Sequence, residues 1–436
     1  MKILFLFIVL IFLFNDIVYS QTQDIDITSY DIKARLTRLS EAIDITLICG
    51  INKHDSSGGL QFLFNSLSII HSVKIQKAGN WIEIPYKFNG SDSLLITAGQ
   101  NILRDKDYLL KFDYSFNAGK LNDTALIIDR GNRWYPLIID KIAPVKLTCE
   151  VPKGYKVLST GNLTGEINKG NKSIFIWQSR SPVFKLPLII FNPKIFKSAN
   201  LDTAGNKIDL FYLPGSRVNT KAILSNIAGA MNYYKNIFGD YPFNKLTLFE
   251  VSDFPGIDIG SGLIMIGTQS LVNAYRGDDD GILFAVTLQW FGANVFAKFG
   301  ERGFFFFTIS LPHYLRLMYI RSWKGEQAYN KSMLQPLSSY KQFAGKRNDI
   351  PILDVDFPNT KEKGLILYAK GPYVLSKVEN EIGKNRWLKF LKDLYGYFHG
   401  KIMTYNDFNT SLDKHDPNGR VIKLFNKLMT EKGLPE

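Results

Sequence analysis

Apolar and polar residues alternate along much of the first half of the chain. Between residues 29 and 196 the period is two, and its plainest example is the apolar series Tyr30, Ile32, Ala34 and Leu36. Similar strand-like runs recur over residues 43–49, 108–114, 145–151 and 174–177, with turn-forming Gly, Asn, Asp and Pro between them. This pattern predicts an antiparallel β-sandwich or saddle.

The period changes after the polar stretch 200–206, which we take as a domain boundary. Residues 208–213, 245–251 and 263–267 still read as strands, whereas apolar residues at a spacing of three and four predict a helix over residues 222–238. Further helices are expected over residues 281–299, 367–382 and 387–397, with a capping box at Thr404 and Asp407. The second half is therefore expected to be mixed but mainly helical.

The N-terminus has the pattern of a secretory leader. Lys2 precedes an unbroken apolar run over residues 3–14, which is short for a membrane span, and Val18 and Ser20 supply the small residues that precede a cleavage site. We expect removal of residues 1–20 and a mature chain that begins at Gln21. The protein is then secreted or periplasmic in the cell envelope; an uncleaved anchor is the alternative.

Composition narrows the classes of partner. Lys and Arg number 53 against 40 Asp and Glu, which gives a net charge of +13, but the excess is spread thinly rather than gathered in one run. This spacing argues against nucleic acid as a partner and favours a solvated basic surface that attracts anionic lipid or polysaccharide. The only two cysteines, Cys49 and Cys149, both lie on the apolar faces of predicted strands, so we expect buried free thiols; a disulfide between them is the alternative if the strands face each other across a sandwich.

One apolar segment of the second half carries a resemblance. Gln289-Trp290-Phe291-Gly292 is similar to the run that follows His-Glu-x-x-His in the zinc helix of the alanyl aminopeptidase family, the gluzincin metallopeptidases that include leukotriene hydrolase. Four other stretches resemble the family in the same order: residues 155–162, 238–245, 253–263 and 368–371. The resemblance implies an α+β multidomain fold with an N-terminal β-sandwich (saddle) domain over residues 21–200. A thermolysin-like catalytic-type domain would follow over residues 201–436.

The chemistry of that family does not carry over. Zinc-assisted hydrolysis needs two histidines one helical turn apart, a third ligand, and a glutamate that takes a proton from the bound water. The resemblance places those functions on Phe284, Leu288, Phe307 and Ala285, and it places the glutamate that binds a substrate's amino group on Ile259. Every replacement is apolar. We therefore expect no zinc and no other cofactor, and a hydrocarbon core in which Phe284 and Leu288 meet Phe307.

Some features of the family's cleft are retained. Tyr368 matches the catalytic tyrosine that donates a hydrogen bond to the developing oxyanion, although a structural role serves equally well. Gly256, Gly262, Leu263 and Gln289 fall at the remnant cleft, where residues 262–267 are expected to carry an extended peptide.

No other constellation supplies a catalytic site. The five histidines form no His-x-x-x-His pair, and only His313 lies near the degenerate positions, where we expect it to be hydrogen-bonded structure rather than a ligand. Asp278, Asp279 and Asp280 suit a helix start better than a metal.

The sequence therefore predicts an exported pseudopeptidase that binds a peptide or protein segment or acts as an envelope scaffold. Two alternatives stay open: a zinc aminopeptidase with an unrecognised site, and a basic module for anionic polysaccharide or lipid.

Overall fold

The computed structural model describes residues 25–36, 41–54, 59–90, 92–97, 107–119, 121, 124–203 and 205–434. The expected leader and its cleavage site lie outside these residues. In the described part of the chain, no helix combines the length and the apolar composition needed to cross a bilayer.

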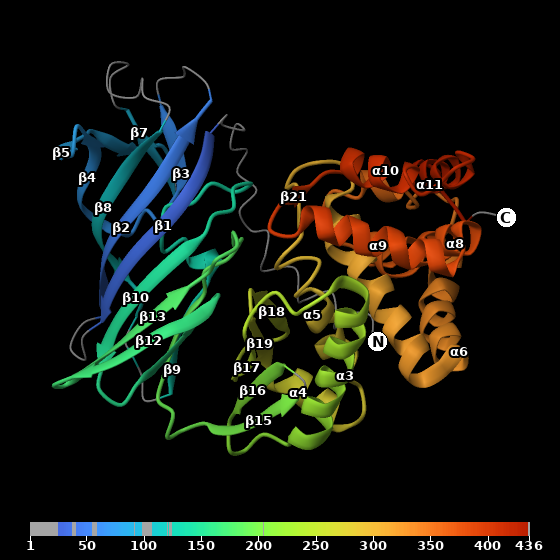
Figure 1. Cartoon of the computed structure of the whole chain (residues 1–436), viewed down its shortest axis with the longest axis horizontal. Coiled ribbons are helices and arrows are strands. Elements are labelled where there is room, and N and C mark those ends of the chain that lie inside the picture. The colour runs from blue at the N-terminus through green and yellow to red at the C-terminus, as the bar shows by residue number, and fades with distance from the viewer. Residues whose placement is uncertain are drawn as a thin grey trace.

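The first domain is built from β-sheets, on the left in Figure 1. Its largest sheet has eight strands in the order β12-β13-β10-β1-β2-β8-β4-β5, and two three-stranded sheets, β11-β14-β9 and β3-β7-β6, complete it. The strands are β1 (Ile25–Leu36), β2 (Ala42–Lys53), β3 (Leu60–Leu63), β4 (Ile69–Lys77), β5 (Asn80–Glu83), β6 (Tyr86–Phe88), β7 (Ser93–Ile96), β8 (Asp107–Asn117), β9 (Ala125–Ile128), β10 (Val145–Pro152), β11 (Lys156–Ser159), β12 (Asn162–Lys169), β13 (Lys172–Gln178) and β14 (Leu188–Phe191).

Alternation of side chains explains these strands. Along β1, Ile32, Ala34 and Leu36 are buried while Lys33 and Arg35 are exposed, as the period of two predicts. The β-rich first domain is thereby confirmed.

The second domain joins a five-stranded sheet to a set of helices, on the right in Figure 1. The sheet order is β15-β16-β17-β19-β18, from β15 (Lys197–Thr203), β16 (Asn206–Tyr212), β17 (Leu246–Val251), β18 (Ile257–Gly260) and β19 (Leu263–Gly267). The helices are α3 (Thr220–Phe238), α4 (Thr268–Tyr275), α5 (Asp280–Thr287), α6 (Leu311–Lys341), α7 (Lys361–Leu365), α8 (Gly371–Ile382), α9 (Lys384–Phe398), α10 (Tyr405–Asp413) and α11 (Arg420–Thr430), with a short strand pair β20 (Phe296–Ala297) and β21 (Ile402–Met403). The mixed, mainly helical second half and the capping box at Thr404 are confirmed.

Two expectations about elements need correction. The polar stretch 200–206 includes the end of β15 and the start of β16, which pair in the second sheet, so the chain enters that sheet before the boundary we placed there. The helix expected over residues 281–299 ends at Thr287, because the chain turns at residues 288–290 and then forms a bridge between Phe291 and Val295.

The five-stranded sheet is covered on both faces. Leu248 and Ile264 belong to the core shared with the helices. Phe249, Leu263 and Met265 belong to the core of the first domain. The ring of Phe249 lies 5.1 Å from that of Phe191. The two domains therefore share a continuous apolar seam.

The two cysteines are separate. Strand β1 lies between them, with Tyr30 opposite Cys49 on β2 and Ala34 opposite Cys149 on β10. Two strand spacings amount to roughly 10 Å, which exceeds the reach of a disulfide. Both thiols are free and buried, as the sequence predicted.

Candidate functional site

Helix α5 and the residue after it hold Phe284, Ala285 and Leu288, to which the resemblance assigned the metal-binding and base positions. Phe284 and Ala285 are buried, with 3% and 1% of their surface exposed, and Leu288, the residue after the helix, is half-buried. No lone pair for a metal is offered by any of these side chains. Across the described ranges, no group of three His, Cys, Asp or Glu residues is placed to hold a metal ion.

The aromatic neighbours of Phe284 differ from those we expected. Its ring lies 6.2 Å from His313 and 6.2 Å from Tyr368, and these two rings are 5.4 Å apart. We call Phe284, His313 and Tyr368 the aromatic trio. Phe307 instead has its ring contacts with Phe306, Tyr405 and Phe408, at 5.2, 6.4 and 5.3 Å. Phe307 is thus buried in a separate aromatic cluster that includes helix α10.

Tyr368 is held by two adjoining π-helical turns. It lies in the turn Ile366–Lys370 before α8, and a similar turn, Phe306–Ser310, precedes α6. The hydroxyl of Ser310 donates a 2.7 Å hydrogen bond to the carbonyl of Leu367, which ties the turns together. A Cβ on Gly371 would lie 2.1 Å from the Ser310 hydroxyl, so only glycine permits this approach. The Gly371 of the Tyr-x-x-Gly run is therefore required for packing.

Burial keeps the Tyr368 phenol in its neutral form. The residue is 6% exposed, and the loss of solvation raises its pKa well above the usual value, although Arg316 lowers it somewhat. A neutral phenol is able to donate a hydrogen bond to a carbonyl oxygen. Donation of this kind polarises a carbonyl but does not by itself generate a nucleophile.

His313 and Arg316 are functional candidates that sequence reasoning undervalued. We expected His313 to be hydrogen-bonded, but its Nδ1 is buried and has no hydrogen-bond partner among the residues that the structure describes. Burial lowers its pKa well below the usual value, and Arg316 adds to the shift, so the ring is neutral. Arg316, with 4% of its side chain exposed, pairs with Asp280 at 2.6 Å. The signal was available: His313 and Arg316 are the polar residues of an otherwise apolar helical turn, three residues apart.

The edge strand of the second sheet is β18. Strand β19, which we expected to carry an extended peptide, is hydrogen-bonded to β17 on one side and to β18 on the other. It has no free edge, so residues 262–267 are unable to add a strand. Only β18 ends the sheet on this side, and in the described part of the chain its outer edge faces no further strand. Leu263 of β19 is buried in the seam between the domains.

The two faces of β18 differ in chemistry. Added side chains on Gly281 and Gly292 would meet Ile257 Cδ1 at 3.1 Å and Ile259 Cδ1 at 3.5 Å, so these isoleucines point toward α5 and the segment after it. Asp258, on the opposite face, accepts a hydrogen bond from the ammonium of Lys185 in the first domain. The position of the family's amine-binding glutamate, Ile259, is therefore a half-buried apolar contact.

Gln289 has a structural task rather than a place in an open cleft. It is fully buried, and its Oε1 accepts from the Gly262 N–H at 2.9 Å and from the Tyr241 hydroxyl at 3.1 Å. Its Nε2 donates to the Gly260 carbonyl at 3.1 Å. One amide thus satisfies both ends of the turn that joins β18 to β19. Gly256 is similarly engaged, because its carbonyl accepts from the Gly267 N–H.

The structure therefore brings together only some of the candidates. Ile259 and Leu288 both lie near Gly292, and the ring of Phe284 packs on Tyr368. Phe307 belongs to the same core as Ala285 but has its ring contacts with other aromatic residues, and Leu263 lies in the core of the first domain.

Comparisons with known proteins agree with this architecture. No family model matches the sequence, and no curated protein matches it. An M1 zinc metallopeptidase mutant from Deinococcus radiodurans, bound to a Tyr-Ser-Ala substrate, is 13% identical with a TM-score of 0.74, covering 95% of this chain and 96% of that chain. A two-domain M1 zinc metallopeptidase mutant bound to L-arginine is 13% identical with a TM-score of 0.75, and the match covers 96% of this chain and 98% of that chain. A two-domain M1 zinc metallopeptidase mutant bound to L-tryptophan is 12% identical with a TM-score of 0.76, and the match covers 95% of this chain and 96% of that chain. The chain has the two-domain fold of the M1 zinc metallopeptidases.

Proposed function

We propose that the protein is an exported pseudopeptidase that binds an extended peptide or protein segment at β18 without hydrolysing it. The observation that carries this proposal is the chemistry of the aminopeptidase positions, which are hydrocarbon throughout. Phe284 and Phe307 are buried among aromatic rings, and Ala285 has no group that accepts a proton. The side chains at these positions supply neither a ligand for zinc nor a base for the attacking water.

The edge position of β18 supports peptide binding. A peptide that pairs with an edge strand gains main-chain hydrogen bonds, and its side chains then reach the pockets beside the strand. The apolar Ile259 and Leu288 are half-buried beside β18 and suit an apolar side chain. The length left for pairing is short, because at the Gly260 end a Cβ would already lie 2.9 Å from Thr160 of the first domain. We therefore expect modest affinity.

The test is binding of fluorescent extended peptides, measured by polarisation. Ile259→Lys places a charge beside the edge of β18 and is expected to weaken binding roughly tenfold, since a buried charge in this setting costs more than 1.4 kcal/mol. The matched control is Ile167→Lys on β12, which is likewise the last strand of its sheet and carries an isoleucine that is 49% exposed. Equal affinities for the two variants would contradict binding at β18.

Catalytic loss has its own test. Purified protein is expected to hold far less than one zinc per chain by elemental analysis and to release no amino acid from aminoacyl substrates. Near-stoichiometric zinc with chelator-sensitive release would instead establish an aminopeptidase. Intact-mass analysis of exported protein tests the leader, and a retained Met1 would contradict its removal.

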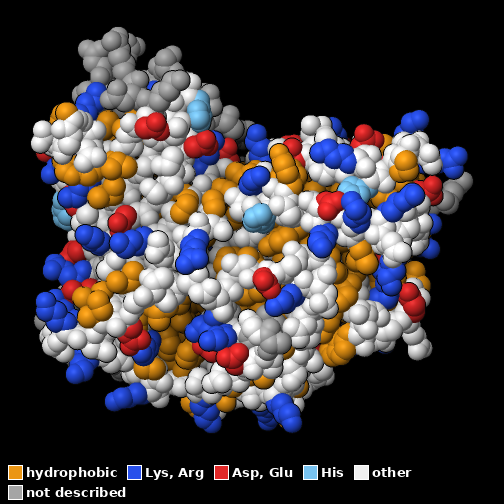
Figure 2. All heavy atoms as spheres, viewed as in Figure 1, with side chains coloured by type: hydrophobic (Ala, Val, Ile, Leu, Met, Phe, Trp, Pro, Cys, Tyr) orange, Lys and Arg blue, Asp and Glu red, His pale blue; other side chains and the backbone are white. Residues whose placement is uncertain are grey.

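The basic-surface alternative predicts a different result. Lys and Arg side chains are scattered over the face in Figure 2 among acidic and apolar ones. Binding to anionic lipid or polysaccharide would weaken steeply with added salt and would not respond to Ile259→Lys.

A further inference from the structure

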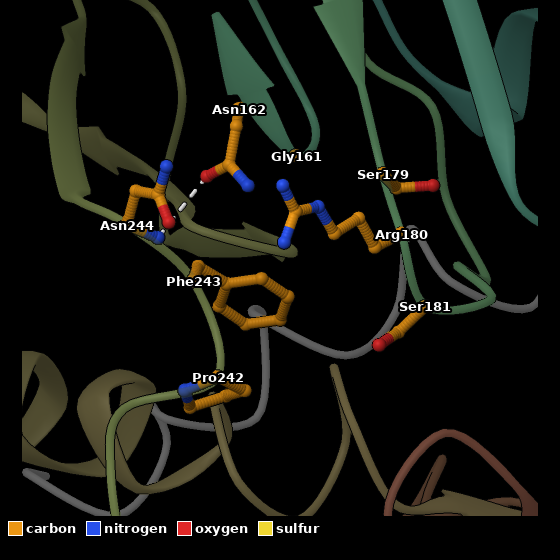
Figure 3. A pocket seen from close by; sticks show the side chains of 8 residues that line it. All are labelled: Gly161, Asn162, Ser179, Arg180, Ser181, Pro242, Phe243 and Asn244. Carbon is orange, nitrogen blue, oxygen red and sulfur yellow. Dashed lines mark hydrogen bonds between the residues drawn. The ribbon is translucent and has the colours of Figure 1, made fainter.

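A polar hollow of about 180 Å³ lies at the junction of the two domains, beside the turn that joins β18 to β19. The first domain contributes Gly161 and Asn162 at the start of β12 and Ser179, Arg180 and Ser181 after β13 (Figure 3). The second domain contributes Pro242, Phe243 and Asn244 from the segment between α3 and β17. We call this the junction hollow.

The walls of the junction hollow are fixed by bonds between the domains. The Asn244 N–H donates to Asn162 Oδ1 at 3.0 Å, and the Gly161 N–H donates to the Ser261 carbonyl at 3.0 Å. Gly161 has a φ of +89°, and a Cβ there would lie 2.7 Å from the Gln178 carbonyl, so this sharp start of β12 requires glycine. The shape of the hollow is therefore set before any ligand arrives.

The charge balance of the hollow selects its ligand. Arg180 extends its guanidinium across the opening toward Asn162 in Figure 3. None of the eight lining residues is acidic. Because Asn162 Oδ1 is occupied by Asn244, the free group of that amide is its Nδ2 donor. A guanidinium and an amide donor that converge without a carboxylate form a site for an oxyanion.

The volume of the junction hollow and its apolar wall narrow the class of ligand further. The volume exceeds what a single inorganic ion fills, and Pro242 and Phe243 supply hydrocarbon opposite the arginine. We propose that the junction hollow binds a small organic carboxylate, with its carboxyl group on Arg180 and its apolar part against Phe243. This proposal does not depend on peptide binding at β18.

The test uses the full mature chain and N-acetylalanine as the probe, with binding followed by calorimetry or by NMR shifts. We expect saturable millimolar binding that falls roughly tenfold when the carboxylate is replaced by an amide, because a charge-assisted hydrogen bond is worth at least 1.4 kcal/mol. Inorganic phosphate is expected to bind more weakly than N-acetylalanine. If the amide binds equally well, or if phosphate binds more tightly, the assignment to organic carboxylates is wrong.

Variants locate the site. Arg180→Gln is expected to weaken binding roughly tenfold and Arg180→Lys by less, since lysine keeps the charge but not the planar fork. Arg347→Gln removes the same charge from an exposed turn elsewhere and is expected to have no effect. Asn162→Asp keeps the acceptor for Asn244 while adding a negative charge, and it should abolish binding of the carboxylate. The proposal is overturned if Arg180→Gln, folded as judged by its melting curve, binds like Arg347→Gln.

Discussion

Two adjoining stretches of one segment, residues 284–288 and 289–292, differ in what their side chains do. The first offers only hydrocarbon at the metal positions, and Phe284 packs on His313 and Tyr368. The second begins with Gln289, which is no less buried but makes hydrogen bonds with both ends of the β18–β19 turn. Burial of a polar side chain is favourable where it supplies hydrogen-bond partners to backbone groups, as Gln289 does, and no backbone group depends on the side chains of Phe284 or Leu288 in this way.

Removal of the Gln289 amide is expected to have the largest effect on stability. Gln289→Leu leaves the Gly262 N–H, the Gly260 carbonyl and the Tyr241 hydroxyl without this partner. At 1–3 kcal/mol for each unsatisfied group, we expect a loss of about 4 kcal/mol in the free energy of unfolding, measured with urea. Gln269→Leu on the exposed face of α4 is the control and should change stability little. A loss below about 1 kcal/mol would show that the turn does not depend on Gln289.

The apolar stretch is tested by returning one metal-binding side chain. Phe284→His replaces a ring that is 3% exposed with a smaller, polar one, and we expect a loss of about 2–3 kcal/mol without any gain of zinc. Leu288→His should cost only about 1 kcal/mol, because the half-buried Leu288 side chain remains in contact with water. Urea melts in the presence and absence of zinc provide the measurement. Stabilisation of either single variant by zinc would refute the view that the remaining ligands are absent.

The neutral His313 predicts a dependence of stability on pH. Its pKa is well below the usual 6.5 in the folded protein, so the unfolded chain binds a proton first as the pH falls. Stability from this group is complete above pH 6.5 and is lost as the pH falls from 6.5 toward the folded-state pKa, by up to about 1.36 kcal/mol per pH unit. His313→Phe should remove this part of the acid sensitivity. An unchanged slope between pH 6.5 and 5 in urea melts would contradict it.

The smallest effect is expected at Ile259, where the family resemblance places an amine-binding glutamate. Ile259→Glu, half-exposed at the edge strand, should make peptides with a free α-amino group bind several-fold more tightly than their acetylated forms. The unmodified protein should not distinguish the two. A parallel titration of both peptides against both proteins provides the measurement. Lack of discrimination by the variant would mean that peptides do not bind here in the orientation proposed.

Sequence patterns predicted the elements well where their period was clear. The alternation along β1 and the helical spacing from Ile223 to Phe238 both mark real elements. The continuous apolar run after Gly281 has no periodic pattern that marks where a helix ends. The sequence therefore predicted a helix that continues past Thr287, where the structure ends it. The order of strands in a sheet is not encoded in any one strand. The sequence therefore did not reveal that β18, rather than residues 262–267 of β19, lies at the edge of the sheet.

The apolar character of Phe284, Ala285 and Leu288 can be read directly from the sequence. Their assignment to metal-binding positions rests on the family resemblance and stays a prediction. The neighbours of Phe284 cannot be read in this way, because whether it meets Phe307 or His313 depends on the two π-helical turns, which local propensity does not reveal.

The apolar seam between the domains has a consequence for expression of the separate domains and for unfolding of the whole chain. Phe249, Leu263 and Met265 belong to the sheet of the second domain but complete the core of the first. A second domain produced alone would present these side chains to water on a sheet face, which is a common cause of aggregation during expression. The first domain alone would lack the same three side chains in its core. The two halves are thus expected to melt together as one cooperative unit, and damage to either one removes both.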